Sequence, residues 1–135
     1  MNILPLVLLI NFEFMKKALI IDDIELNRIH VQALLKAYNF ESILVDNAMT
    51  AYDMINEENY DLVMVDWHMP DMDGVEFIKK TRRTPRGLGL MILLYSAVED
   101  IQGVQTALNA GADGFLSKPV RKSDLEYKLT SIGLI

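Results

Sequence analysis

Residues 61–74 read DLVMVDWHMPDMDG, and this stretch combines an apolar strand with an acidic end. Residues 62–65 are all apolar, which is typical of a central strand covered on both faces of a sheet. Asp66 follows directly, where a carboxylate is costly unless it has a partner. Residues 73–76 then open a helix that continues through Lys80. The stretch predicts a buried strand, a functional acid at its end, and a helix that packs back onto the sheet.

The same alternation of apolar strands and amphipathic helices continues on both sides of this stretch. Four further strands are predicted at residues 18–21, 43–45, 90–95 and 115–116. Helices are predicted around residues 26–37, 47–55, 73–80, 98–110 and 123–132, and residues 84–89 are predicted to form a loop. Five strands alternating with five helices predict one α/β domain: a doubly wound, five-stranded parallel sheet with helices on both faces.

The sequence makes more specific predictions for two of the helices. Apolar residues recur at helical spacing in the first helix, at Leu26, Ile29, Ala33, Leu34 and Ala37. The last helix opens at residues 123–126, which read SDLE and match the pattern of a capping box.

The composition limits the classes of function. About half of the 135 residues are apolar and about a quarter are charged, as in ordinary globular proteins. The chain has no cysteine, which excludes thiol catalysis and thiolate metal sites and favours a cytoplasmic location. Its net charge of −6 argues against binding to nucleic acid or to an anionic membrane. The basic run at residues 79–86 is interpreted as a solvated helix end, with a docking patch for an acidic partner as the alternative.

The first fourteen residues differ from the rest. Residues 3–10 form an apolar run that is too short to span a bilayer. The run lacks the basic leader and the small-residue cleavage site of a signal peptide. We therefore divide the chain into an apolar extension at residues 1–14 and a domain at residues 15–135. Whether the extension packs on the domain or on a second copy stays open.

Polar residues stand at the ends of four predicted strands. Asp22 and Asp23 end the first strand, Asp66 the third and Ser96 the fourth, and the fifth runs into Lys118. Ligands of open α/β sheets bind beyond the carboxyl ends of the strands. We therefore expect three carboxylates, a hydroxyl and an ammonium group at one edge of the sheet.

This set of groups suits phosphoryl transfer. Three neighbouring carboxylates repel one another, and Mg2+ relieves that repulsion because it prefers hard oxygen ligands. A carboxylate such as Asp66 can attack a phosphoryl donor while the metal offsets the charge of the transferred group. Lys118 would supply a second positive charge, and Ser96 a hydroxyl donor.

Four stretches resemble the receiver domains of two-component response regulators. They read LIIDD at residues 19–23, VDWHMPDMDG at 65–74, YSA at 95–97 and GADGFLSKP at 111–119. The resemblance covers residues 16–135 and is that of a single-domain, chemotaxis-type receiver. It implies the flavodoxin-like (βα)5 fold with strand order 2-1-3-4-5.

The resemblance also implies roles for particular residues. Asp66 would be the phosphoacceptor, with Asp23 and Asp66 as direct magnesium ligands. Asp22 would act through water, and the backbone carbonyl of His68 would complete the protein ligands.

Further implied roles concern the switch. Ser96 and Lys118 would hold the phosphoryl group, and the Lys118–Pro119 peptide bond would be cis. Phe115 occupies the position of the switch aromatic residue, where Ser96 moves toward the phosphoryl group and the aromatic ring turns inward behind it.

The family's partners follow from the same resemblance. The phosphoryl group would come from a sensor histidine kinase or a histidine phosphotransfer protein. A downstream protein would dock on the 98–110 helix, the fifth strand and the last helix, and a homodimer through this surface stays open. The chain would be a signalling switch and not an enzyme that turns over a substrate.

The site residues also admit other interpretations. Asp22 or Asp23 alone could cap the first helix, and Ser96 stands in a capping-box pattern of its own. A haloacid dehalogenase would carry a second acid two residues after Asp66, where this chain has His68. In a flavin-binding module, the acids at residues 22 and 23 would repel the flavin phosphate. A receiver-fold adaptor that signals without phosphorylation remains the alternative.

Overall fold

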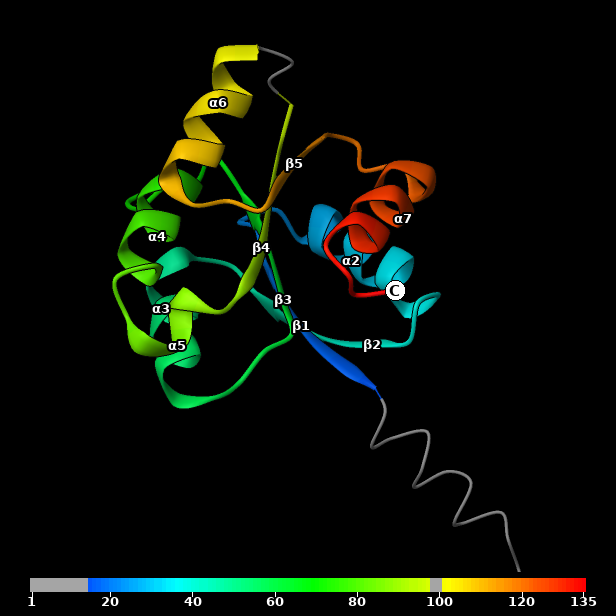
Figure 1. Cartoon of the computed structure of the whole chain (residues 1–135), viewed down its shortest axis with the longest axis horizontal. Coiled ribbons are helices and arrows are strands. Elements are labelled where there is room, and N and C mark those ends of the chain that lie inside the picture. The colour runs from blue at the N-terminus through cyan, green and yellow to red at the C-terminus, as the bar shows by residue number, and fades with distance from the viewer. Residues whose placement is uncertain (1–14, 98–100) are drawn as a thin grey trace, which may run out of the picture.

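The computed structural model describes residues 15–97 and 101–135 of the chain (Figure 1). The strands are β1 (Lys16–Ile21), β2 (Phe40–Val45), β3 (Leu62–Asp66), β4 (Met91–Ser96) and β5 (Gly114–Ser117). The helices are α2 (Glu25–Lys36), α3 (Ala48–Glu57), α4 (Gly74–Thr81), α5 (Pro85–Leu88), α6 (Ile101–Ala110) and α7 (Lys122–Ser131). The predicted extension at residues 1–14 and the start of the predicted 98–110 helix lie outside the described residues.

The described strands form one parallel sheet in the order β2-β1-β3-β4-β5, which confirms the predicted doubly wound topology. Residue 21 of β1 pairs with residue 65 of β3. Asp66 pairs with Tyr95 of β4, and Ser96 pairs with Ser117 of β5. Because all the strands are parallel, their carboxyl ends reach the same edge of the sheet, and the predicted site residues lie there.

Helices cover both faces of the sheet. Helices α2 and α7 lie on one face, and α3, α4 and α6 lie on the other (Figure 1). Strand residues alternate between the two cores: Ile20 and Met64 join the α2/α7 core, whereas Ile21 and Val65 join the opposite one. All five residues of β3 are buried, as predicted for a strand with helices above and below it.

Helix caps explain several of the helix boundaries. The Asn47 side chain accepts a hydrogen bond from the backbone N–H of Thr50 at 2.8 Å, and Asp73 does the same for Glu76. The prediction of a capping box at residues 123–126 is wrong, because α7 starts one residue earlier, after Arg121, and has no side-chain cap.

The predicted apolar stripe of the first helix is wrong except at Leu34, which packs against the α2/α7 core. Leu26 is 76% exposed and Ile29 is 46% exposed, whereas Val31 and Leu35 are buried. The helix is rotated because its polar residues contact the end of β1: the Arg28 guanidinium donates to the backbone carbonyl of Asp22 at 2.7 Å. A tertiary contact at the site thus overrides the pattern of the isolated helix.

Residues 84–89, predicted as a loop, contain the short helix α5. Thr84 caps it by accepting from the Gly87 N–H at 3.0 Å, and Pro85 fits its first turn. Added at Gly87, a Cβ atom would lie 1.8 Å from the backbone carbonyl oxygen of Thr81, so glycine is required there. The loop is therefore a compact turn packed on the end of α4.

Arg82 holds this turn to the start of two strands. Its guanidinium donates to the backbone carbonyls of Gly87, Leu90 and Gly111 at 2.8, 2.6 and 2.9 Å. It also forms a 2.9 Å ion pair with Asp113. The interpretation of the whole basic run as a solvated helix end is therefore wrong for Arg82, which is a structural residue.

Within residues 15–97 and 101–135, no helix is long and apolar enough to cross a membrane.

Candidate functional site

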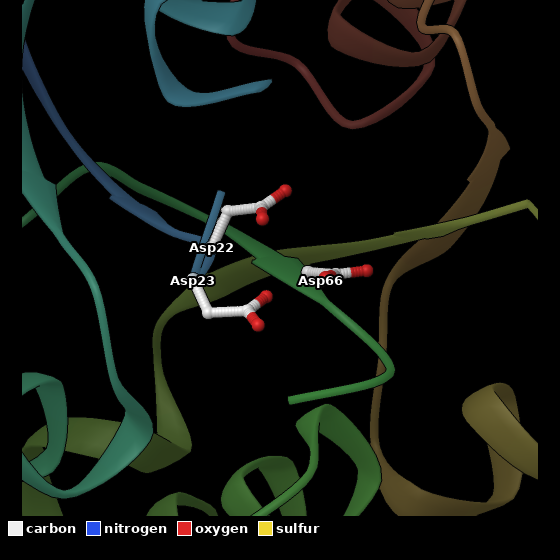
Figure 2. A group of neighbouring side chains, drawn as sticks. All are labelled: Asp22, Asp23 and Asp66. Carbon is white, nitrogen blue, oxygen red and sulfur yellow. The ribbon is translucent and has the colours of Figure 1, made fainter. Parts of the chain in front are cut away.

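Three carboxylates meet at the carboxyl edge of the sheet. Asp22 and Asp23 follow β1 and Asp66 ends β3, and Figure 2 shows the three side chains side by side. One oxygen atom from each lies within 4.8 Å of the other two. Asp22 and Asp66 are buried, whereas Asp23 is exposed. The predicted convergence of these acids is confirmed, and Asp23 is the one open to solvent.

Lys118 supplies the positive charge of the site. Its Nζ atom lies 2.9 Å from Oδ1 of Asp66 and 3.4 Å from Oδ2 of Asp22. The backbone N–H of Lys118 donates to the carbonyl of Ser96 at 2.8 Å, which joins the segment after β5 to the end of β4. The Lys118–Pro119 peptide bond is cis, as predicted. The lysine predicted from a strand end therefore pairs with the predicted acids.

Ser96 is buried at the end of β4, one residue beyond the partner of Asp66 in the sheet. Its predicted capping box extends into residues 98–100, which lie outside the described residues. The structure therefore places Ser96 at the edge where the acids meet, and its role in the site stays a prediction.

The aromatic residues near the site form a continuous group. Trp67 stacks on His68, with ring centroids 5.4 Å apart and planes 5° apart. Phe115 and Trp67 form a T-shaped pair, with ring centroids 6.5 Å apart and planes at 80°. Phe115 is partly exposed and joins the segment after Asp66 to β5. The predicted switch residue therefore contacts the neighbour of the candidate phosphoacceptor.

Tyr95 is a site residue that the sequence analysis missed. Its buried hydroxyl donates to Oδ2 of Asp22 at 2.9 Å, and its ring lies 5.2 Å from Nζ of Lys118. Burial and the neighbouring carboxylate of Asp22 raise the pKa of Tyr95, so the phenol stays protonated and acts as a donor. A tyrosine within an apolar strand looks like an ordinary core residue. No pattern in the sequence marked it, because β4 is apolar up to Tyr95 and buried on both faces of the sheet.

Asp22 also closes the turn into α2. Its Oδ1 atom accepts from the backbone N–H of Ile24 at 2.9 Å. The alternative role of Asp22 as a helix cap is wrong, because the N-cap of α2 is Ile24 and no side chain caps it. Asp22 holds the turn before the helix, in addition to its contacts with Lys118 and Tyr95.

The charges of the site do not balance. Burial raises the pKa of Asp66, the charges of Asp22 and Asp23 raise it further, and Lys118 opposes them. Three carboxylates face one ammonium group, which leaves an excess of negative charge beside oxygen ligands. This donor set fits a hard divalent cation such as Mg2+.

The raised pKa of Asp66 predicts how stability depends on pH. Between pH 3.8, the ordinary value, and the higher folded-state pKa, the folded protein binds more protons than the unfolded chain. The contribution of Asp66 to stability is thus present at low pH and is lost as the pH rises through that window. In chelator at pH 7 we expect Asp66→Asn to raise the free energy of unfolding, because the amide carries no charge to desolvate and Lys118 keeps Asp22 as its partner.

This gain should shrink as the pH falls toward 3.8, measured by urea unfolding of both proteins at each pH. Asp53→Asn, on the exposed side of α3, is the matched control and should change stability little at any pH. A gain for Asp66→Asn that grows on acidification would contradict the assigned direction of the pKa shift.

The fold and the site together define a receiver domain: a β2-β1-β3-β4-β5 sheet with an acidic cluster and a paired lysine at its carboxyl edge. Residues 18–130 match the response regulator receiver domain, and the chain belongs to this family. The chain is thus a receiver of the kind used in two-component and chemotaxis signalling, a family that interacts with histidine kinases and downstream targets.

Particular relatives support this assignment. The chain is 32% identical over 117 residues to the chemotaxis protein CheY-3 of Vibrio cholerae serotype O1, covering 86% of this chain and 90% of that protein. A crystal structure of a putative response regulator from Chloroflexus aurantiacus has a TM-score of 0.83 at 26% identity, covering 87% and 97% of the two chains. Chemotaxis response regulator CheY4 of Vibrio cholerae has a TM-score of 0.80 at 26% identity, covering 87% and 98%.

Proposed function

We propose that the chain is a phosphorylation-dependent signalling switch whose phosphoacceptor is Asp66. The contact of Asp66 with Lys118 beside Asp22 and Asp23 is the observation that carries this proposal. A buried carboxylate at a strand end, with a cation at 2.9 Å and two more acids within 4.8 Å, has the groups that phosphoryl transfer requires.

The proposed reaction is a direct transfer to the carboxylate. An oxygen of Asp66 forms a bond to the phosphorus of a phosphohistidine or a small phosphodonor. The bond between phosphorus and the leaving group breaks, and the leaving group departs with the electron pair and takes up a proton. Lys118 then pairs with a phosphoryl oxygen, and Ser96 donates its hydroxyl to another.

The acids would hold the magnesium ion. Asp23 and Asp66 are the proposed direct ligands, Asp22 acts through water, and the backbone carbonyl of His68 completes the protein ligands. When bound, Mg2+ offsets the negative charge of the phosphoryl group. The exposed position of Asp23 suits an ion that enters from solvent.

The conformational change would spread from the site through Ser96 and Phe115. A phosphoryl group adds charge and strong acceptors at Asp66, which favours movement of Ser96 toward it. Phe115, a residue of β5, contacts Trp67, which follows Asp66 in the chain. Its reorientation would change the surface formed by α6, β5 and α7, where a downstream protein or a second copy would bind.

Intact-mass spectrometry tests this function. After incubation with Mg2+ and acetyl phosphate, the parent chain should gain one phosphoryl group, because Asp66 offers one activated carboxylate. Asp66→Asn should gain none, and a chelator should remove the reaction in the parent. Asp53→Asn, an exposed acid on α3, is the control and should react like the parent.

Two outcomes would reject the proposal. An adduct that persists in Asp66→Asn would place the acceptor elsewhere in the chain. No adduct in the parent with acetyl phosphate or a phosphorylated histidine phosphotransfer protein would favour the receiver-fold adaptor, which signals by constitutive binding.

A further inference from the structure

Tyr95 lies in the same row of the sheet as the two buried acids. Asp66 pairs with Tyr95 across β3 and β4, and the register of β1 with β3 brings Asp22 level with Asp66. Partners in adjacent parallel strands point to the same face, so all three side chains project toward the α2/α7 side. Tyr95 is 1% exposed, and it is the one aromatic residue of β4.

Tyr95 contacts two charged groups of the site in different ways. Its hydroxyl donates to Oδ2 of Asp22 at 2.9 Å. Its ring lies 5.2 Å from the ammonium group of Lys118, within the range of a cation–π interaction. One side chain thus contacts both charged groups that flank Asp66: the carboxylate of Asp22 and the ammonium group of Lys118.

The contacts of Asp22 show why the hydroxyl matters. Its Oδ1 atom accepts from the N–H of Ile24 at 2.9 Å and from the Asn27 amide at 3.5 Å. Its Oδ2 atom accepts from Tyr95 at 2.9 Å, while Lys118 stands at 3.4 Å. Lys118 thus stands closer to Asp66, at 2.9 Å, than to Asp22, whose oxygens accept from other donors.

We propose that Tyr95 is a positioning residue of this site: its hydroxyl holds Asp22, so that the ammonium group of Lys118 is directed to Asp66. The proposal rests on the proposed function, in which Lys118 serves the phosphoryl group on Asp66. Tyr95 also precedes Ser96 in the chain, and its backbone carbonyl accepts from the Trp67 N–H at 3.1 Å. The same residue therefore ties the ends of β3 and β4 together behind the site.

Tyr95→Phe tests the hydroxyl alone, because the ring beneath Lys118 is kept. Without its phenol donor, buried Asp22 should attract Lys118 away from Asp66. We expect phosphorylation by acetyl phosphate to slow about tenfold, the effect of losing one hydrogen bond to a charged group. The NMR signal of the Lys118 ammonium group, assigned with Lys118→Arg, should shift in the metal-free variant.

Tyr60→Phe is the matched control. Tyr60 is also a buried tyrosine that donates to a carboxylate, Glu58, at 3.4 Å, but it lies before the start of β3, away from the site. This control should leave both the phosphorylation rate and the Lys118 signal unchanged. An unshifted Lys118 signal together with a parental rate in Tyr95→Phe would reduce Tyr95 to a core residue and overturn the proposal.

A double-mutant cycle with Asp22→Asn separates a direct effect on Asp22 from a general loss of packing. If Tyr95 acts through Asp22, Tyr95→Phe should have little further effect on the Lys118 signal and on stability once Asp22 is replaced. Additive effects would contradict the proposal. The double variant also covers the case in which Tyr95→Phe alone is too unstable, because it removes the buried charge that the lost hydroxyl leaves unpaired.

The two proposals can fail separately. If the parent chain accepts no phosphoryl group, the proposed function fails, but the Lys118 signal and the stability cycle still test the contact in the unmodified protein. If the parent is phosphorylated and the cycle shows no coupling, only the role of Tyr95 fails.

Discussion

Replacement of Arg82 by methionine is expected to lower the free energy of unfolding by about 3 kcal/mol. The guanidinium donates to the backbone carbonyls of Gly87, Leu90 and Gly111 and pairs with Asp113. Methionine fills a similar volume but leaves these acceptors without their donor. Urea-induced unfolding, with far-UV circular dichroism as the readout, measures the loss.

Arg83→Met is the control for this prediction. Arg83 is the next residue in the chain and is exposed, so the same substitution there should change stability by less than about 0.5 kcal/mol. The free energy of unfolding of Arg82→Lys should lie between those of the two methionine variants, because lysine keeps the charge but cannot reach several acceptors at once. Equal stabilities for Arg82→Met and Arg83→Met would show that the carbonyls are satisfied without Arg82.

The topology could be predicted because it follows from patterns that are local in the sequence. The apolar run before Asp66 is long enough for a strand and uniformly apolar, so it indicates burial on both faces, and all of β3 is buried. Alternation with helices then restricts the connections to right-handed crossovers. The strand order itself came from resemblance to receivers and is confirmed by the pairing of the strands.

Long-range polar contacts were not predictable in the same way. Arg82 stands in a run of basic residues that suggests a solvated helix end, yet it binds carbonyls up to 29 residues away. The apolar stripe of α2 was misplaced for a related reason, since Arg28 turns toward the end of β1. In both cases the decisive partner is distant in the sequence, and no periodic pattern marks it.

In the candidate site, too, the residues at strand ends were predictable and the residue within a strand was not. Asp22, Asp23, Asp66 and Lys118 were predictable because each stands at the end of a strand or just beyond it, and all parallel strands end at one edge. Tyr95 lies inside its strand, where an aromatic residue indicates core. Its polar role depends on the register of β1, β3 and β4, which the sequence alone does not define.

Lys118→Met is expected to cost about 3 kcal/mol of unfolding free energy in chelator, because buried Asp22 and Asp66 lose their shared cation. Mg2+ should then stabilise the variant more than it stabilises the parent, since the metal and Lys118 offset the same excess of negative charge. Urea unfolding with and without Mg2+ gives both quantities.

Lys122→Met, at the exposed start of α7, is the control and should respond to Mg2+ like the parent. A larger Mg2+ effect in Lys118→Met alone would mean that Lys118 is the resident cation of the metal-free site. An equal effect in all three proteins would contradict that role, because the acids would then bind the metal independently of the lysine. The larger effect would also show how Lys118 offsets charge in the site: its ammonium group contacts the two buried acids, and the third, Asp23, remains in contact with solvent.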